Sequence, residues 1–125
     1  MGGTVQQNTR CVKVRHLAAK LSGCDPVILN DKNSLIQVLD EVSRAVKMTI
    51  ISRLSHSFTP QGISLVYLLA ESHISIHTWP ECGIADLEIV TCNEDSDVTV
   101  GLKLCCERLK AEKSDHRIWT FTHHY

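Results

Sequence analysis

The chain has 125 residues, of which 43% are hydrophobic and 22% are charged. This size and composition predict one compact domain over residues 1–125, with too little chain for two independent cores. The net charge of −1 gives no reason to expect a nucleic acid partner, and no apolar run is long enough to cross a membrane. The first eight residues lack the features of a secretion signal, so we expect a cytoplasmic protein.

The N-terminal part of the chain predicts a strand followed by a helix. Residues 11–21 favour a strand, and the turn-forming residues of 22–26 predict a loop. Apolar residues then recur at helical spacing over 35–46, with Asn33 or Ser34 available as the N-cap.

The middle of the chain predicts four consecutive strands. Residues 48–57 and 63–70 flank a turn at 59–62 that contains proline and glycine, which fits a reversal of direction. Residues 72–78 and 84–91 are rich in isoleucine, valine and threonine and predict two more strands.

The C-terminal part predicts a second helix from Val98 to about Lys113, capped by Asp97, and a last strand over 117–123. The helices are separated by several strands, which is typical of an antiparallel or mixed sheet. We therefore predict an α+β fold, a two-layer sandwich in which two helices cover one face of a mainly antiparallel sheet. The six cysteines include no tight C-x-x-C pair, so we expect reduced, mostly structural thiols.

Residues 70–81 combine a serine, two histidines and two glutamates within twelve positions. In a strand, Ser72 would lie on one face and His73 and His77 on the other. In a helix, the two histidines and the last glutamate would line up as possible metal ligands. The β-branched residues and the restriction that Pro80 places on its neighbour favour the strand, so we expect no metal site.

The bond between Glu71 and Ser72 is a possible site of self-cleavage. The Ser72 hydroxyl could attack the preceding carbonyl to give an ester, and a base could then remove the serine α-proton. Elimination would release the N-terminal fragment and leave dehydroalanine, which hydrolyses to a pyruvoyl group. Such a ketone can form a Schiff base with a substrate amine and act as an electron sink. From residue types alone, the alternative is a serine hydrogen-bonded within a strand.

The run Glu-Ser-His-Ile-Ser-Ile-His-Thr-Trp-Pro-Glu resembles the processing site of bacterial and archaeal S-adenosylmethionine decarboxylases. These are pyruvoyl-dependent proenzymes of spermidine and polyamine biosynthesis. The resemblance extends over roughly residues 14–110, and its motifs lie at 15–17, 23–25, 56–64, 71–81 and 91–92. It implies cleavage into a β chain, 1–71, and an α chain, 72–125, with a pyruvoyl group as the cofactor and no metal.

The resemblance also assigns roles in processing and catalysis. Ser72 is the pyruvoyl precursor, His77 the base that drives elimination, and Ser64 a residue that assists processing. Cys92 would return a proton to the substrate α-carbon, which suits a thiol because thiols are mostly protonated at neutral pH. Taken singly, each side chain could also be an ordinary strand residue.

Three further residues are assigned to substrate binding by the resemblance. Glu81 would accept hydrogen bonds from the two ribose hydroxyls, and Phe58 would stack on the adenine ring. Trp79 would contact the substrate near its sulfonium, because aromatic faces attract cations. The resemblance further implies a homodimer with active sites near the interface.

The chain departs from the family pattern at a few positions near these motifs. Leu65 and Asn93 stand where glycine is usual, and Asp86 stands where a small apolar residue is usual. An added carboxylate could favour a cationic amino acid. A pyruvoyl-dependent arginine or ornithine decarboxylase of the same fold therefore stays an alternative, as do a binding homologue that does not process itself and a histidine-cysteine metal protein.

Overall fold

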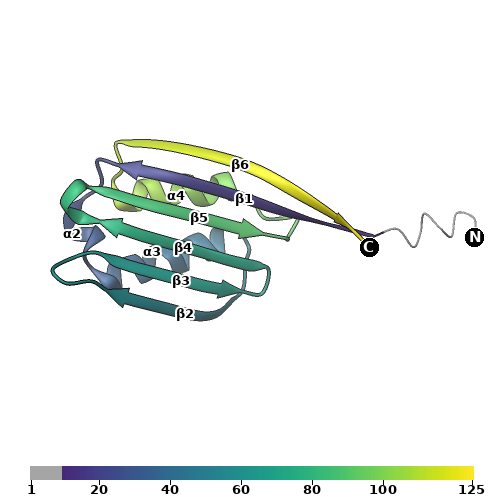
Figure 1. Cartoon of the computed structure of the whole chain (residues 1–125), viewed down its shortest axis with the longest axis horizontal. Coiled ribbons are helices and arrows are strands. Elements are labelled where there is room, and N and C mark those ends of the chain that lie inside the picture. The colour runs from purple at the N-terminus through teal and green to yellow at the C-terminus, as the bar shows by residue number, and fades with distance from the viewer. Residues whose placement is uncertain (1–9) are drawn as a thin grey trace, which may run out of the picture.

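A computed structural model describes residues 10–125 as one sheet with helices on one of its faces (Figure 1). All strand pairs are antiparallel, and the six strands have the order β2-β3-β4-β5-β1-β6. The strands are β1 (Cys11–Ser22), β2 (Ile50–Ser57), β3 (Ile63–Leu69), β4 (Ser72–Trp79), β5 (Ile84–Thr91) and β6 (Lys113–His124). The helices are α2 (Pro26–Leu29), α3 (Lys32–Ala45), α4 (Val98–Leu109) and the 3₁₀ turn η1 (Pro80–Cys82). The predicted α+β sandwich is confirmed.

The first helical region differs from the prediction in its caps. The N-cap of α3 is Asp31, because its carboxylate accepts hydrogen bonds from the Asn33 amide at 3.2 Å and the Ser34 hydroxyl at 2.7 Å. Asn33 and Ser34, which the sequence predicted as caps, instead donate hydrogen bonds to Asp31, which is the N-cap. The expected loop at 22–26 leads into the short helix α2, which begins at a proline whose fixed φ suits the first helical position.

The C-terminal elements also have different bounds from those predicted. Helix α4 ends at Leu109, because Lys110 adopts the left-handed conformation with a φ of 58°. Strand β6 begins at Lys113, not at residue 117, because its backbone pairs with β1 from Ser22 onward. Pairing over such a distance in the chain leaves no local pattern in the sequence.

The hydrophobic core lies between the sheet and the helices α3 and α4. Helix α3 contributes Leu35, Leu39 and Val42, which are fully buried. At Gly101 of α4, an added Cβ would lie 2.8 Å from Ile89 of β5, so the absence of a side chain lets the helix approach the sheet closely. The core therefore fixes β5 and its neighbour β4 against a rigid layer.

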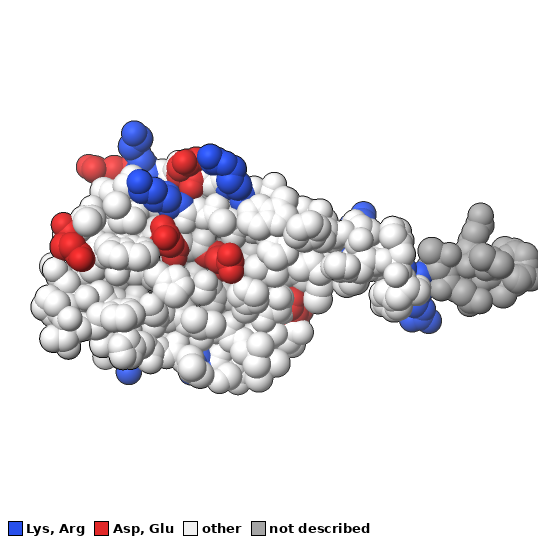
Figure 2. Space-filling model, in the orientation of Figure 1, with Lys and Arg blue, Asp and Glu red and all other residues white. Residues whose placement is uncertain are grey.

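The opposite face of the sheet is open (Figures 1 and 2). Lysine, arginine, aspartate and glutamate side chains gather above β1, β5 and β6, whereas the face of β2 to β4 carries few of them. Apolar side chains are exposed on it, including Leu54 at 70% and its cross-strand partner Val66 at 41%. An open, partly apolar face of this extent is typical of an interaction surface.

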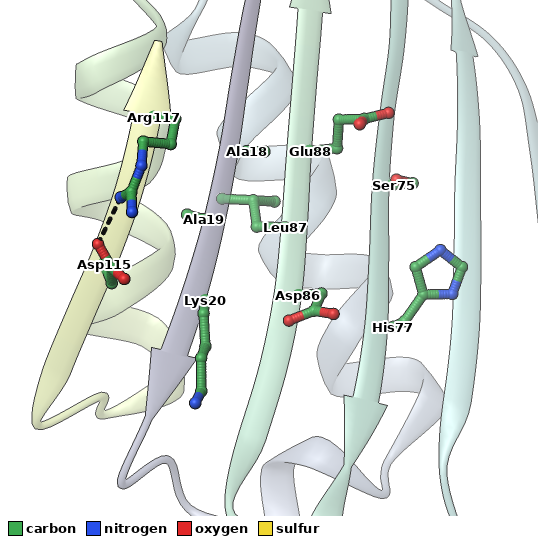
Figure 3. Close-up of a pocket in the computed structure, with 10 residues that line it drawn as sticks. All are labelled: Ala18, Ala19, Lys20, Ser75, His77, Asp86, Leu87, Glu88, Asp115 and Arg117. Atoms are coloured by element: carbon green, nitrogen blue, oxygen red, sulfur yellow. Dashed lines mark hydrogen bonds and ion pairs between the residues drawn. The ribbon is translucent and has the colours of Figure 1, made fainter.

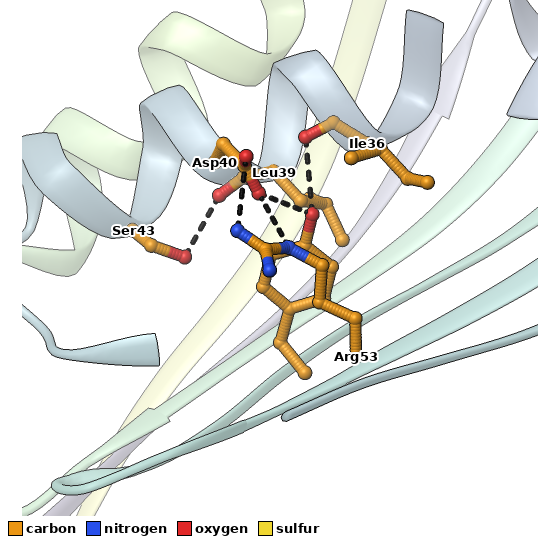
Figure 4. Close-up of polar contacts among 6 residues, drawn as sticks. Ile36, Leu39, Asp40, Ser43 and Arg53 are labelled. Atoms are coloured by element: carbon orange, nitrogen blue, oxygen red, sulfur yellow. Dashed lines mark hydrogen bonds and ion pairs between the residues drawn. The ribbon is translucent and has the colours of Figure 1, made fainter. Parts of the chain in front are cut away.

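A polar network fastens α3 to the β2 and β3 strands (Figure 4). Arg53 of β2 binds both carboxylate oxygens of Asp40, at 3.0 and 3.1 Å, and the Tyr67 hydroxyl donates to the same carboxylate at 2.5 Å. Burial opposes ionisation of Asp40, but the hydrogen bonds from Arg53 and Tyr67 outweigh it and hold the pKa of this carboxyl below its usual range. Burial and the neighbouring carboxylate raise the pKa of Tyr67.

We predict that Asp40→Ala lowers the free energy of unfolding by about 2 kcal/mol, because Arg53 loses its carboxylate acceptor and the Tyr67 hydroxyl keeps only the Ile36 carbonyl at 3.0 Å. Because the folded-state pKa of Asp40 is depressed, its contribution is present above the unfolded value of about 3.9 and is lost as pH falls through the folded value. Urea unfolding at pH 7 and at pH 3 should show a smaller difference at the lower pH.

The matched control is Glu41→Ala, which removes a partly exposed ion pair with Arg108 at 2.8 Å. It should cost at most about 1 kcal/mol. Equal losses for the two variants would contradict a special role for the Asp40 network.

Candidate active site

The residues predicted from the family pattern lie at the two ends of β4. Ser72 is the first residue of the strand and His77 is five positions further on. At about 3.3 Å per residue, their backbones are about 16 Å apart. One cluster contains Glu71, Ser72 and Cys92, and the other contains Phe58, Ser64, His77, Trp79 and Glu81. A single chain thus does not bring Ser72 and His77 together.

The first cluster is built around the peptide bond that joins Glu71 to Ser72. The carbonyl oxygen of Glu71 accepts a hydrogen bond from the backbone amide of Cys92 at 2.9 Å. The Glu71 carboxylate is held in turn by the amide of Thr49, also at 2.9 Å. The carbonyl is therefore fixed and polarised by a backbone donor, which can stabilise negative charge developing on its oxygen.

Ser72 has an unusual backbone conformation, with a φ of 149°. Residues other than glycine rarely adopt such angles, and each instance costs on the order of 1–3 kcal/mol. The surrounding strand pairing, Ser72 with Leu69 on one side and with Thr91 on the other, holds this residue in place. The strain lies at the residue where the sequence predicts cleavage.

The regular alternation predicted for this strand is wrong at its first residue. The Ser72 hydroxyl lies 3.4 Å from Nδ1 of His73, although neighbouring strand residues normally face opposite sides. The other ring nitrogen of His73 lies 3.3 Å from Oε1 of Glu88 on β5. No sequence pattern indicates a role for His73 or Glu88, because His73 contacts Ser72 only through a departure from regular strand geometry and Glu88 contacts His73 from the neighbouring strand.

The second cluster forms a hollow of about 420 Å³. Within it, the Ser64 hydroxyl and Nδ1 of His77 are 2.7 Å apart, because the two residues are cross-strand partners of β3 and β4. The hollow is lined by Phe58, Gln61, Gly62, Ser64, His77, Thr78, Trp79 and Glu81. Five of the residues named by the family resemblance thus lie around one space, and Gln61, Gly62 and Thr78 complete its lining.

Local structure explains why the hollow has this shape. Thr78 is buried, accepts from the amide of Ile63 at 2.9 Å, and donates to the carbonyl of Leu29 at 2.8 Å. Gly62 has a φ of 103°, and a Cβ there would lie 3.1 Å from the Thr78 carbonyl. The chain then leaves β4 through η1, which carries Glu81 at the edge of the hollow.

A second hollow of about 520 Å³ lies on the open face beside His77 (Figure 3). It forms because Ala18 and Ser75 are small, whereas their neighbours are long and charged. The charged residues around it are Lys20, Asp86, Glu88, Asp115 and Arg117. Asp86 is the cross-strand partner of His77, but the His77 ring leans away from it toward β3. The unusual carboxylate at 86 therefore lies beside the predicted site.

The thiols and carboxylates do not assemble into a further cluster. Within residues 10–125, no group of three or more His, Cys, Asp or Glu residues is arranged to hold a metal ion. All six cysteines are free; Cys24 and Cys105 are buried, and burial raises the pKa of Cys24 to about 11. No helix among these residues is long and apolar enough to span a membrane.

The fold matches that of a solved decarboxylase. The crystal structure of the adenosylmethionine decarboxylase from Aquifex aeolicus superposes with a TM-score of 0.80 and 30% identity, over 86% of this chain and 89% of that one. A sequence model of the family, described as S-adenosylmethionine decarboxylase, matches residues 15–119.

Sequence relatives lead to the same family. An S-adenosylmethionine decarboxylase proenzyme from Pyrobaculum islandicum is 38% identical over 83% of this chain and 84% of the relative. Another proenzyme of that name, from Acetivibrio thermocellus, is 37% identical over 78% of this chain and 79% of the relative. The chain belongs to the S-adenosylmethionine decarboxylase family, and the resemblance found in the sequence is confirmed.

Proposed function

We propose that this chain is a proenzyme that cleaves itself between Glu71 and Ser72 and then decarboxylates S-adenosylmethionine, a step of polyamine biosynthesis. The observation that carries the proposal is the strained Ser72, which follows a carbonyl already bound by the Cys92 amide. Family membership, with relatives named as proenzymes, supports both the processing and the substrate. The products are the fragments 1–71 and 72–125.

The first chemical step is attack by the Ser72 hydroxyl on the carbonyl carbon of Glu71. The amide of Cys92 stabilises the charge that develops on the carbonyl oxygen. The peptide bond then breaks and leaves an ester, from which a base removes the α-proton of Ser72; we assign that base to His77. Elimination releases the 1–71 carboxylate and leaves dehydroalanine, which takes up water and loses ammonia to give a pyruvoyl group at residue 72. That group would supply a ketone for a Schiff base with the substrate amine and an electron sink for decarboxylation.

The hollow around His77 has the groups that a nucleoside substrate requires. Phe58 and Trp79 are half-exposed aromatic side chains that can stack on adenine and face a sulfonium cation. Glu81 supplies a carboxylate for the ribose hydroxyls. The volume of about 420 Å³ lies within the range of small-molecule sites.

An arginine or ornithine decarboxylase stays the second candidate because Asp86 and Glu88 line the neighbouring hollow. Lys20 and Arg117 line the same hollow and offset these carboxylates, which favours S-adenosylmethionine. Release of carbon dioxide from each labelled substrate separates the two. Activity on the amino acids alone would exclude the first candidate.

We expect purified wild-type protein to consist of two chains and Ser72→Ala to stay as one, because alanine has neither a nucleophile nor a leaving group. Intact-mass spectrometry reports the cleavage, its position and the new terminal group together. Ser55→Ala, which removes an exposed hydroxyl of β2, is the matched control and should cleave like the wild type. A wild-type chain that stays whole would rule out both decarboxylases in favour of a binding homologue.

Cys92→Ala should separate processing from decarboxylation. The variant keeps the backbone amide that binds the Glu71 carbonyl, so cleavage should continue, whereas loss of the thiol proton donor should lower kcat by about 10²-fold or more. Fragment formation and carbon dioxide release measured on one sample test this. Cys11→Ala removes an exposed thiol at the first residue of β1 and serves as the control. Full activity of Cys92→Ala would remove the proposed role.

We propose that the active site is completed in a homodimer. Ser72 and His77 are about 16 Å apart along one strand, too far for direct proton transfer. Two open sheet faces can pack about a two-fold axis that lies between the sheets and runs perpendicular to β4 over its middle. Ser72 of one chain then lies over His77 of the partner subunit. The exposed Leu54, Leu68 and Phe121 supply apolar surface for such packing.

The composite site predicts complementation between two inactive variants. Ser72→Ala and His77→Ala should each stay uncleaved alone. When they are co-expressed with different tags, the His77→Ala chain should be cleaved, because its partner supplies the missing imidazole. Mass spectrometry identifies which tagged chain is cut, and sedimentation reports the oligomeric state. Absence of cleavage in isolated mixed dimers would place both groups in one chain and contradict this arrangement.

A cytoplasmic location also remains our proposal. Six free cysteines, three of them exposed, support a reducing compartment, where exposed thiols persist. Fractionation of cells that express the tagged chain tests it.

A further inference from the structure

We infer that His73, oriented by Glu88, is the base that takes the proton from the Ser72 hydroxyl in the first step of self-cleavage. The inference rests on the proposed function and extends it, because His77 is assigned only to the later elimination. A hydroxyl needs a neighbouring base to act as a nucleophile at neutral pH. His73 is the imidazole that contacts Ser72 within the described residues.

The contacts form a chain from hydroxyl to imidazole to carboxylate. Ser72 Oγ is 3.4 Å from Nδ1 of His73, and Nε2 of His73 is 3.3 Å from Oε1 of Glu88. An ionised carboxylate can only accept a hydrogen bond, so it favours the tautomer with the proton on Nε2. The lone pair on Nδ1 then faces the hydroxyl. This is the order of roles in which a nucleophile, a base and an orienting group act together.

The backbone of Ser72 makes this contact possible. In a regular strand, the side chains of residues 72 and 73 would lie on opposite faces of the sheet. The φ of 149° departs from that geometry, and the Ser72 hydroxyl lies beside the ring of its neighbour. The strain therefore has a chemical consequence: it presents the nucleophile to a base in the same chain.

The step balances without another reagent. The proton moves from Ser72 Oγ to Nδ1 of His73 while Oγ bonds to the carbonyl carbon of Glu71. The bond from that carbon to the Ser72 nitrogen then breaks, and the nitrogen takes the proton back from the imidazolium. The products are an ester and a free amine, and His73 ends as it began. The amide of Cys92 holds the carbonyl oxygen throughout.

The two proton transfers, from the Ser72 hydroxyl and then from its α-carbon, would be made by histidines of different chains. His73 serves Ser72 of its own chain, whereas His77 lies about 16 Å away and would serve the partner subunit. Two other histidines on this face contact aromatic rings: His16, which is level with His73 two strands away, stacks on Trp119, and His56 contacts Phe58. Lys20, Asp86, Asp115 and Arg117 line the second hollow.

The test follows cleavage of freshly synthesised full-length chains over time. His73→Gln should slow fragment formation by about 10²-fold or more, and Glu88→Gln by about tenfold. Asp115→Asn, which removes a carboxylate bound only to Arg117, and His16→Gln, which removes a ring stacked on Trp119, are matched controls. Cleavage of His73→Gln at the wild-type rate overturns the inference.

A second readout separates chemistry from misfolding. Hydroxylamine cleaves esters, so His77→Ala, which blocks only elimination, should be cut by it between residues 71 and 72. Uncleaved His73→Gln should resist it, because no ester has formed. If His73→Gln fails to fold by circular dichroism, the same comparison is made with Glu88→Gln. An ester that accumulates equally in the tested variant and in His77→Ala overturns the inference.

Co-expression tests whether the base acts within its own chain. Tagged His73→Gln paired with Ser72→Ala, which keeps an intact His73, should stay uncleaved. Cleavage of the tagged chain in this pair overturns the inference. The outcome is distinct from failure of the proposed function, because in that case the wild-type chain itself would not be cleaved at Ser72.

Discussion

The register of β4 between β3 and β5 is the constraint on which both clusters depend. It places His77 opposite Ser64 on one side and opposite Asp86 on the other. The same register sets Ser72 against Thr91. As a result Cys92, the residue after β5, donates its backbone amide to the Glu71 carbonyl. A shift by one residue would turn the imidazoles into the core and remove both arrangements together. The core beneath β4 and β5 therefore protects the site as well as the fold.

The charges of the open face constrain how it can be covered. Lys20 of β1 is the cross-strand partner of both Asp86 and Asp115, so charges of opposite sign alternate across three strands. Burying unpaired charges costs several kcal/mol each, whereas an alternating row can be covered with its charges compensated. The half of the face over β2 to β4 carries few charges and exposes Leu54 and Val66 instead. A partner surface would need compensating charges over β1, β5 and β6 and apolar side chains over β2 to β4.

The sequence predicted the fold class, and the family resemblance named the members of both clusters. Isoleucine and threonine in 72–78, with Pro80 after them, predict the strand that is observed, and the resemblance selects the residues that line the hollow. Two features could not be predicted. The conformation of Ser72 is strained, and local preferences do not favour strained backbone. The contact between His73 and Glu88 joins two strands and depends on their register.

The topology explains how a chain cut after residue 71 can remain one domain. The cut lies between β3 and β4, where Leu69 and Ser72 are already paired, so no ladder is broken. Strand β1 belongs to the N-terminal fragment, yet it lies between β5 and β6 of the C-terminal fragment. Such fragments would be interleaved, and separating them would require breaking the β1 ladders on both sides as well as the pairing of β3 with β4. The proposed cleavage would also remove the peptide bond that holds Ser72 at its strained φ. The topology would thus allow one strained bond to be cut while three strand ladders hold the two products together.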